Sequence, residues 1–331
     1  MWFEKLFGFS EESIAQVQQH LIVADGKITS TVNGKSYQHG RLEVITLETL
    51  KRAGKTKEKY QSQIQVVEVI GNVQHLHQVQ ANEGAFFQAA SQFNLLEMIS
   101  PQATPALGVG IYENDRTQGP ACAIACGAGT VYRNYFVPIK DQIGQSKELQ
   151  IDCLATIAEA LDNDTLQLWE MQNGYALPTS AESLRRIATA INTLDTAGYE
   201  ALKGKLEIGI QWDTEVTMGT SQHTVTQAYC SALPVAYAKF EAELWEPFAR
   251  LILEATYEAT LYAALQNFEH TKNPKVYLTL VGGGAFGNAR SWIFEALAGA
   301  INQFKNTPLE IKIVSYGKSD PAVEIFVEQW G

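Results

Sequence analysis

The fold is decided by the stretch VYLTLVGGGAFGN, residues 276–288. Its first six residues are apolar, aromatic or β-branched, which predicts a strand over 276–281. The glycines that begin at Gly282 let backbone N–H groups turn inward without Cβ clashes. Apolar residues recur three and four apart from Trp292 to Ile301, which predicts a helix whose N-terminus adds partial positive charge. A strand, a glycine loop and a helix in this order predict a site that holds phosphate with backbone groups.

Strand-like and helix-like segments alternate over the rest of the chain. Further strands are predicted at 63–70, 206–212 and 309–315, and several of them are apolar on both faces. A sheet that is buried on both faces needs helices on each side. The sequence therefore predicts an α/β fold, as a single elaborated domain over residues 1–331 with a helical insertion at about 140–200.

Two stretches before the middle of the chain carry weaker patterns. Residues 83–98 have apolar residues at helical spacing, after a short strand predicted at 79–82. Polar residues such as Gln92 would crowd the surface of this helix. Residues 130–138 are rich in aromatic side chains and are predicted to be extended.

Two helices are predicted in the second half of the chain. Residues 180–194 have an amphipathic pattern, and Ser180 stands at the N-cap position. Residues 234–268 predict one long helical segment. We expect Pro247 to break this segment or to start a second helix, because proline lacks the N–H that a helix interior needs.

Composition excludes several classes of partner. The net charge of −11 argues against broad binding to nucleic acids or to acidic membranes. The Lys-rich run at 51–59 is interpreted as a solvated loop. No apolar run approaches the roughly 18 residues needed to cross a bilayer, and residues 1–10 have no signal-peptide pattern. Four cysteines provide no dense disulfide framework, so a reducing cytoplasm is the expected compartment.

Residues 282–288 differ from two other kinds of glycine loop in the residues that follow them. A P-loop needs Lys and then Ser or Thr directly after its last glycine, where this chain has Asn288 and Ala289. The spacing of a dinucleotide-binding fingerprint is present, but an acidic residue should end the next strand. Ser315 stands there instead, and too little chain follows it for the rest of a dinucleotide domain.

Three separated pieces of the sequence resemble the macrodomain superfamily. Residues 66–73 are similar to the strand and turn that receive adenine, and 81–87 fall where an Asn-bearing loop lies beside the distal ribose. Residues 282–288 resemble the diphosphate loop of poly(ADP-ribose) glycohydrolases, including its aromatic residue. The resemblance implies a three-layer, macrodomain-like mixed sheet flanked by helices, with helical insertions.

The resemblance also implies roles for individual residues. Asn72 would lie near adenine, Asn82 would face the distal ribose, and the glycine loop would wrap the diphosphate. Gln92, in the polar segment after Asn82, is expected to add one more amide. The full set of expected ligand-binding residues is Asn72, Asn82, Gln92, Gly282, Gly283, Gly284, Ala285, Phe286, Gly287 and Asn288.

Hydrolysis of a bond at the distal ribose needs a carboxylate that orients water. Glu83 is the leading candidate because it adjoins Asn82, and Asp115 is the second because it opens a polar turn. Glu254 and Glu258 lie one helical turn apart, where they either form ion pairs or hold a metal. The expected site contains neither a metal nor a cofactor.

The sequence thus predicts an ADP-ribose-binding protein that hydrolyses an ADP-ribosyl adduct. Two alternatives stay open. The Gly-Gly-Gly run and the paired glutamates of the glycohydrolases are missing after Asn82, which favours a protein that binds ADP-ribose without turnover. A nucleotide- or dinucleotide-dependent enzyme with a similar glycine loop is the third interpretation.

Overall fold

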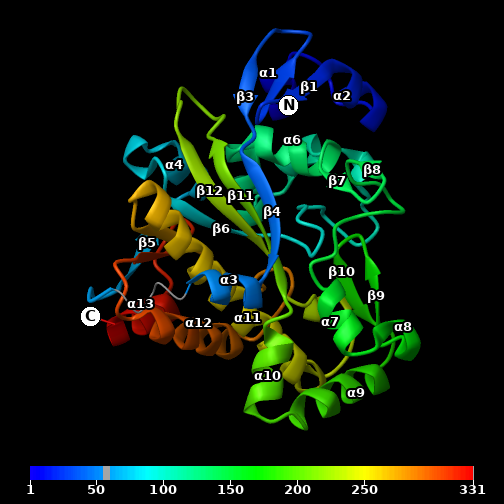
Figure 1. Ribbon diagram of the computed structural model, residues 1–331, viewed down its shortest axis with the longest axis vertical. Helices are drawn as coiled ribbons and strands as arrows, with labels where there is room; N and C mark the ends of the chain where they lie inside the picture. The colour runs from blue at the N-terminus through cyan, green and yellow to red at the C-terminus, as the bar shows by residue number, and fades with distance from the viewer. Residues whose placement is uncertain (55–59, 331) are drawn as a thin grey trace.

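A seven-stranded mixed sheet forms the centre of the computed structural model, which describes residues 1–54 and 60–330 (Figure 1). Its strands are β4 (Arg41–Thr46), β5 (Gln65–Ile70), β6 (Phe86–Ala90), β11 (Glu207–Glu215), β12 (Thr224–Cys230), β13 (Lys275–Leu278) and β14 (Glu310–Ser315). They lie in the order β4-β11-β12-β6-β13-β14-β5. Neighbours from β12 to β5 pair in parallel, whereas β11 pairs antiparallel with both β12 and β4.

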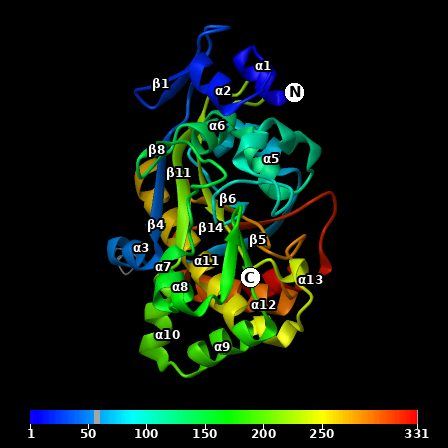
Figure 2. The ribbon, with the colours of Figure 1, turned by 90° about the vertical axis from the view of Figure 1, so that its right-hand side faces the viewer.

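Two groups of helices enclose this sheet. They are α3 (Leu47–Ala53), α4 (Val73–Gln78), α5 (Gln118–Ala125), α6 (Gly127–Tyr135), α11 (Ala242–Thr271), α12 (Arg290–Phe304) and α13 (Pro321–Val327). The helices α4, α5 and α6 cover one face, and α11 with α3, α12 and α13 covers the other (Figures 1 and 2). The predicted α/β class, a mixed sheet flanked by helices in three layers, is confirmed.

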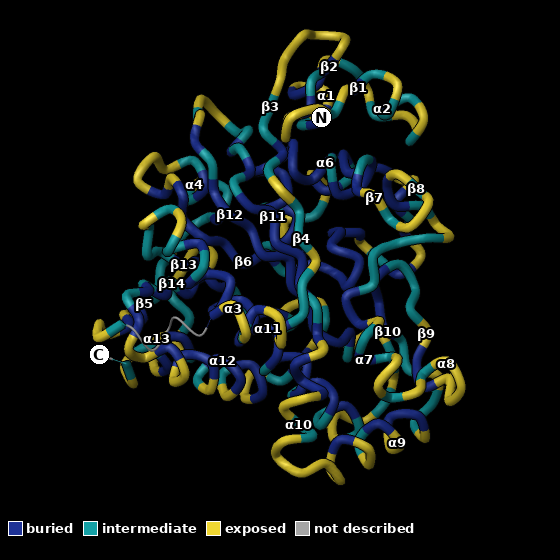
Figure 3. Tube along the Cα trace, in the orientation of Figure 1, coloured by how far each residue is buried: buried dark blue, intermediate teal, exposed yellow. Residues whose placement is uncertain are grey.

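The central strand β6 shows why both faces need helices. Phe87 stacks on His77 of α4, with ring centroids 3.8 Å apart. Its neighbour Gln88 points to the opposite face, where its amide donates to Thr260 of α11 at 2.9 Å. Successive side chains of a strand alternate between faces, so a strand buried on both sides must be covered twice. Figure 3 shows the central strands and α11 as the most buried part of the chain.

A small N-terminal unit sits beyond one end of the sheet (Figure 2). It contains α1 (Trp2–Phe7), α2 (Ile14–His20) and an antiparallel sheet of β1 (Leu21–Ala24), β2 (Lys27–Ser30) and β3 (Ser36–Gln38). Phe3, Phe7 and Ile28 form its own apolar cluster, which also includes Val131 of α6. The unit is therefore packed onto the main body through α6.

Between β6 and β11 the chain adds a largely helical region. Its elements are β7 (Pro138–Ile139), β8 (Gln142–Ile143), α7 (Ala155–Ala160), α8 (Asn163–Leu166), β9 (Trp169–Gln172), β10 (Tyr175–Pro178), α9 (Ala181–Asn192) and α10 (Thr196–Lys203). The Ser180 side chain accepts a hydrogen bond from Ser183 N at 3.0 Å, which confirms it as N-cap of α9. The helix α9 packs against α11, so this region contacts the helical layer that contains α11.

Short 3-10 helices fill several connections. They are η2 (Gln80–Asn82), η3 (Pro105–Leu107), η4 (Gly110–Asn114), η5 (Val235–Tyr237) and η6 (Glu328–Trp330). Among the residues that the structure describes, no helix is long and apolar enough to cross a membrane.

The local predictions at 79–98 and 130–138 were wrong. Residues 79–82 contain the 3-10 helix η2, and residues 83–98 contain the central strand β6 and a loop in place of a helix. Residues 130–138 lie largely in the helix α6. Sheet pairing on both sides of β6 outweighs the helical spacing of its apolar residues. Tyr135 of α6 is buried and Tyr132 packs against the same cluster, and these tertiary contacts override the preference of aromatic residues for strands.

Pro247 does not break α11, contrary to the prediction. The helix runs without interruption from Ala242 to Thr271. Pro247 lies in its second turn, so the hydrogen bond that proline removes would have gone to Glu243 in the first turn. The rest of the ladder is intact, and the helix begins later than the predicted residue 234.

Candidate functional site

A cleft runs along the edge of the sheet where β12, β6, β13, β14 and β5 end. Because these strands are parallel, the segments that follow them all emerge at this edge. Three connected cavities of about 510, 250 and 460 Å³ lie there, and Thr279, directly after β13, lines all of them. Open α/β sheets bind ligands at the carboxyl ends of their strands, in cavities of this size.

The largest cavity, here the wide cavity, lies at the ends of β5 and β14. Asn72, which follows β5, is one of its lining residues. The Asn72 side-chain oxygen accepts a hydrogen bond from Gln74 N at 2.9 Å and caps α4, so its NH₂ group is the part left for a ligand. Trp2 of α1 and the 76% exposed Tyr316 add aromatic surface to the walls.

The second cavity, here the loop cavity, is formed by the glycine loop. Gly282 and Gly287 have positive φ values of 78° and 70°. A Cβ on Gly282 would lie 2.6 Å from the Ala232 side chain, and one on Gly287 would lie 2.8 Å from Ala236. Both positions therefore require glycine, whereas a methyl group at Gly284 would meet no atom within 4 Å and that position is open.

Several backbone N–H groups of this loop are available to a ligand. Gly283 N, Gly287 N and Asn288 N donate within the loop and its flanks, to Leu280 O, Gly284 O and Gly282 O. No acceptor within the described part of the chain receives the N–H of Gly282, Gly284, Ala285 or Phe286, which all line the loop cavity. Unpaired N–H groups on consecutive residues of a tight loop form a binding site for an anion.

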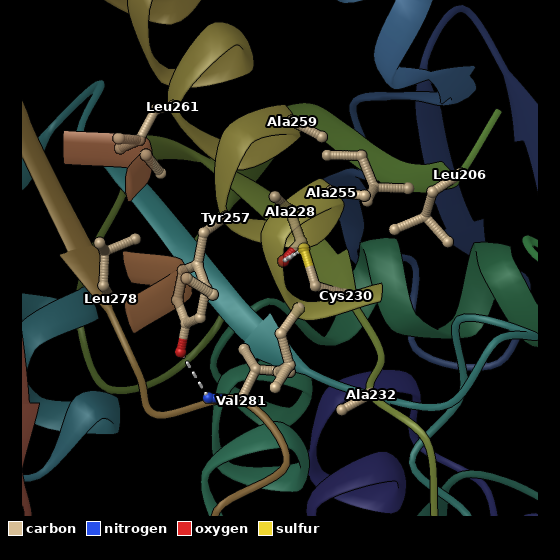
Figure 4. Packing of buried hydrophobic residues seen from close by; sticks show 14 of the residues in the cluster. Leu206, Ala228, Cys230, Ala232, Ala255, Tyr257, Ala259, Leu261, Leu278 and Val281 are labelled. Carbon is tan, nitrogen blue, oxygen red and sulfur yellow. Dashed lines mark hydrogen bonds between the residues drawn. The ribbon is translucent and has the colours of Figure 1, made fainter. Parts of the chain in front are cut away.

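A tyrosine of α11 holds the residues just before the glycine loop in place. Tyr257 accepts a hydrogen bond from Val281 N at 3.0 Å, drawn in Figure 4, and donates to Thr279 O at 2.9 Å. Asn288 closes the other end, because its amide donates to Leu233 O at 2.8 Å. Asn288 and Gly283 line none of the three cavities, so they shape the loop from within.

The opposite wall is the polar turn that opens α5. Gln118 extends the edge of β6: its side chain accepts from Ala90 N at 2.8 Å and donates to Gln88 O at 2.7 Å. Asp115 lines both the wide cavity and the loop cavity, and its carboxylate accepts from Thr117 N at 2.8 Å. The structure thus brings the predicted Asp115 next to the glycine loop.

Asn82 and Glu83 lie away from this cleft, contrary to the prediction. Both precede β6, so the whole strand, about 17 Å long, separates them from the carboxyl edge. The Asn82 side chain is buried, donating to Leu76 O and accepting from Tyr277 at 2.9 Å. Glu83 is exposed and accepts from Gln80. The resemblance placed residues 81–87 in a loop beside the distal ribose, but the strand β6 separates Asn82 and Glu83 from the cleft.

Gln92 and Glu97 follow β6 and line the loop cavity. The Gln92 side chain accepts from Met98 N at 2.9 Å. Glu97 is buried with its carboxylate 3.8 Å from Arg133, and neither oxygen has a hydrogen-bond partner in the described chain. Burial, which outweighs the attraction of Arg133, raises the pKa of Glu97 to about 8. Glu97 is therefore largely protonated at neutral pH.

Glu258 forms ion pairs, one of its two expected roles, whereas Glu254 makes a hydrogen bond and no ion pair with the described residues. Glu258 is buried and contacts Lys51 and Lys203, both at 2.9 Å. Glu254 accepts from Tyr199 at 3.1 Å. No group of possible metal ligands was found in the part of the chain that the structure describes. The basic run at 51–59 lies mostly outside the described residues.

Several lining residues carry no sequence signal of their own. Tyr175 of β10 packs against Phe286 with ring centroids 5.3 Å apart, and Tyr237 packs against both. These residues come from distant segments, and Trp2 comes from the first helix. Their positions depend on the tertiary fold. Thr279 could have been found from the sequence, because it ends the strand before the glycine loop.

Solved structures of two poly(ADP-ribose) glycohydrolases are similar to this chain at low sequence identity. No protein-family model and no curated protein matches this chain. A solved structure of poly(ADP-ribose) glycohydrolase from Deinococcus radiodurans in complex with ADP-ribose is similar at 9% identity and a TM-score of 0.46, over 86% of this chain and 91% of the other. The Thermomonospora curvata enzyme is similar at 11% identity and a TM-score of 0.45, over 96% and 97%.

Proposed function

We propose that this protein binds ADP-ribose, or an ADP-ribosylated adduct, along the cleft. The observation that carries the proposal is the set of unpaired N–H groups on Gly282, Gly284, Ala285 and Phe286. These groups suit a diphosphate, because they offer several donors to anionic oxygens at one place. The macrodomain-like loop sequence supports ADP-ribose among the nucleotide diphosphates.

The cleft has room for the two ends of such a ligand. The wide cavity beside Asn72 would receive the base, between the aromatic surfaces of Trp2 and Tyr316. The loop cavity would receive the distal ribose, beside Gln92 and Asp115. Both cavities share Asp115, Thr117, Gln118 and Thr279, so one elongated ligand can pass from one to the other.

Hydrolysis at the distal ribose is the activity we propose, with Asp115 as the carboxylate that orients water. Asp115 reaches the cleft, whereas Glu83, expected to play this role, lies at the opposite edge of the sheet. Binding without turnover is the second candidate. It is favoured by the sequence, because the paired glutamates of the glycohydrolases are missing after Asn82.

Replacing Asp115 with Asn tests this assignment. The amide keeps the size of the side chain but cannot accept a proton, so we expect turnover of an ADP-ribosyl adduct to fall about a hundredfold or more. Binding of ADP-ribose, measured by calorimetry, should change little. Glu83→Gln is the matched control and should leave turnover unchanged. Equal activity of Asp115→Asn and the unmodified protein would sink the catalytic role.

Binding itself is tested by thermal unfolding with ADP-ribose, ATP, NAD and NADP in parallel. A ligand that binds only the native state stabilises it by about 3 kcal/mol at a hundredfold excess over its Kd. The largest shift is expected with ADP-ribose. A larger shift with NAD or NADP would favour a dinucleotide-dependent enzyme instead.

The proposal extends to the compartment and to the kind of partner. A reducing cytoplasm is supported by Cys122, Cys126, Cys153 and Cys230, which are free and buried. The net charge of −11 supports a small ligand or a protein adduct over broad nucleic-acid binding.

A further inference from the structure

A third cavity branches from the cleft at the end of β14. This side cavity, of about 460 Å³, is lined by Arg290 at the start of α12, by Leu280 and by residues of the 314–321 segment. The proposed function places the base in the wide cavity, the diphosphate on the glycine loop and the distal ribose in the loop cavity. The side cavity is therefore open to a further chemical group.

The segment that forms its outer wall is held in one conformation by Glu68 of β5. The Glu68 carboxylate accepts hydrogen bonds from the Ser315 and Ser319 hydroxyls and from Asp320 N. Burial alone would raise the pKa of Glu68, but these hydrogen bonds outweigh it and lower the pKa. The wall is thus built around an ionised carboxylate at neutral pH and does not depend on a ligand for its shape.

Two cations face the side cavity. Arg290 is fixed by Asp320, with its Nη2 2.7 Å from the carboxylate, and its guanidinium lies 5.5 Å from the Phe294 ring centre. Its Nε and Nη1 groups form no hydrogen bond with the described residues. Lys318 has no carboxylate within 4.0 Å in the described parts of the chain. An arginine with free donors beside an unpaired lysine favours a phosphate group.

The connection between the cavities indicates which part of the ligand reaches these cations. Thr279, Val314 and Tyr316 line both the wide cavity and the side cavity. A ligand with its base in the wide cavity and its diphosphate on the glycine loop must place its first ribose between them. The side cavity opens at this junction, so a substituent on a hydroxyl of that ribose would point toward Arg290 and Lys318.

We propose that the side cavity binds a phosphate monoester on the ribose next to the base, so that the preferred ligand is a ribose-phosphorylated adenosine nucleotide. This inference rests on the proposed function, because it uses the position of the base and of the diphosphate. It adds a substrate class: ADP-ribose or a related nucleotide that carries a third phosphate.

Calorimetric titration of the whole protein tests the proposal. The ligands are ADP-ribose, AMP, adenosine 2′,5′-bisphosphate and adenosine 3′,5′-bisphosphate, so that the two bisphosphates differ only in the ribose hydroxyl that is phosphorylated. We expect one bisphosphate to bind about tenfold more tightly than AMP, as charge-assisted hydrogen bonds allow. The preference should shrink at high salt, because Lys318 is exposed.

Lys318→Met removes the charge and keeps most of the side chain. It should reduce the preference to less than about threefold and leave the affinity for AMP unchanged, since the lost contact is with the extra phosphate alone. Lys305→Met is the matched control, an exposed lysine that follows the far end of α12, roughly 22 Å from Arg290. It makes the same change in net charge and should leave the preference intact.

Each other result overturns a specific claim. If AMP and ADP-ribose bind and neither bisphosphate binds more tightly, the side-cavity proposal is wrong and the proposed function stands. If Lys305→Met lowers the preference as much as Lys318→Met, net charge explains it and the side-cavity proposal is again wrong. If none of the adenosine ligands binds, the proposed function fails, and this inference fails with it. Thermal midpoints close to that of the unmodified protein will show that both variants are folded.

Discussion

Gly287 and Gly284 belong to one loop but are constrained in different ways. Gly287 has a φ of 70° and its Cα faces the Ala236 side chain, whereas Gly284 has neither a positive φ nor a close neighbour. The loop therefore needs glycine at Gly287 for its shape, and keeps Gly284 open toward the cavity.

Replacing each glycine with alanine separates these constraints. Gly287→Ala should lower the free energy of unfolding by about 1–3 kcal/mol, because it adds both backbone strain and an overlap with Ala236. Gly284→Ala should change it by less than about 0.5 kcal/mol. Urea unfolding curves of the two variants provide the measurement. A Gly284→Ala variant that is the less stable of the two would contradict the loop geometry.

Glu97 makes stability depend on pH. Its pKa is about 8 in the native state because of burial, whereas the carboxyl ionises near 4.5 when exposed in the unfolded chain. Between these values the unfolded state binds fewer protons than the native state, so stability falls as pH rises. The loss is of order 1 kcal/mol per pH unit for this group.

Glu97→Gln keeps the neutral form at every pH. The stability of the variant relative to the unmodified protein should rise from pH 5 to pH 8 and then level off, because only the unmodified protein loses stability through this group. Thermal unfolding across this pH range gives the difference directly. A difference that stays constant with pH would show that Glu97 ionises normally in the folded protein.

At the scale of elements, the cleft depends on the junction between α11 and the end of β13. Tyr257 is buried in α11, and its hydroxyl makes hydrogen bonds to Val281 N and to Thr279 O. These bonds join the long helix to the residues just before the glycine loop. The position of the loop relative to the sheet is therefore set by a side chain 24 residues earlier than Val281.

Tyr257→Phe removes the hydroxyl and keeps the ring. We expect a loss of about 1–2 kcal/mol in the free energy of unfolding, since two hydrogen bonds to the hydroxyl are lost, while Val281 N keeps its hydrogen bond to Thr279 O. Affinity for ADP-ribose should fall several-fold, because the loop is no longer anchored. Calorimetry and urea unfolding measure the two effects. Tyr262→Phe, a change in a buried tyrosine of the same helix, provides a comparison for the binding effect.

At the scale of the whole molecule, a buried charge cluster joins parts of the chain that lie far apart in sequence. Glu258 of α11 contacts Lys51 of α3 and Lys203 of α10, so it links the helical layer to the added helical region. Burial would lower the pKa of both lysines, but the hydrogen bonds that they donate to Glu200 and Glu258 outweigh it and raise the pKa. The resulting stabilisation is present at neutral pH and is lost above the ordinary lysine pKa of 10.5.

Glu258→Gln tests this link. Two partly buried lysines lose a charged partner, so we expect a loss of about 3 kcal/mol in the free energy of unfolding. Glu182→Gln, which removes an exposed partner of Arg185 and Arg186 in α9, should cost less than about 0.5 kcal/mol. Unfolding measured at low and high salt should show little change in the effect at Glu258. Equal effects of the two substitutions would refute the structural role of the cluster.

The sequence by itself determined the features that depend on local chemistry. The apolar run at 276–281 and the glycines after it predicted a strand followed by a glycine loop, and the structure has the inner strand β13 with the loop at its carboxyl end. Ser180 predicted the start of α9 because an N-cap satisfies an N–H within its own turn. Asn72, expected from the resemblance, and Asp115, expected from its polar turn, both line the wide cavity.

Only the tertiary structure decided which residues meet at the cleft. The helical spacing of 83–98 gave way to the strand β6, because pairing with β12 and β13 buries both of its faces. That strand carries Asn82 and Glu83 to the far edge of the sheet and leaves Asp115 beside the glycine loop. The side cavity likewise joins α12 with the segment after β14, which a local pattern cannot predict, because contacts between distant segments arise only from packing.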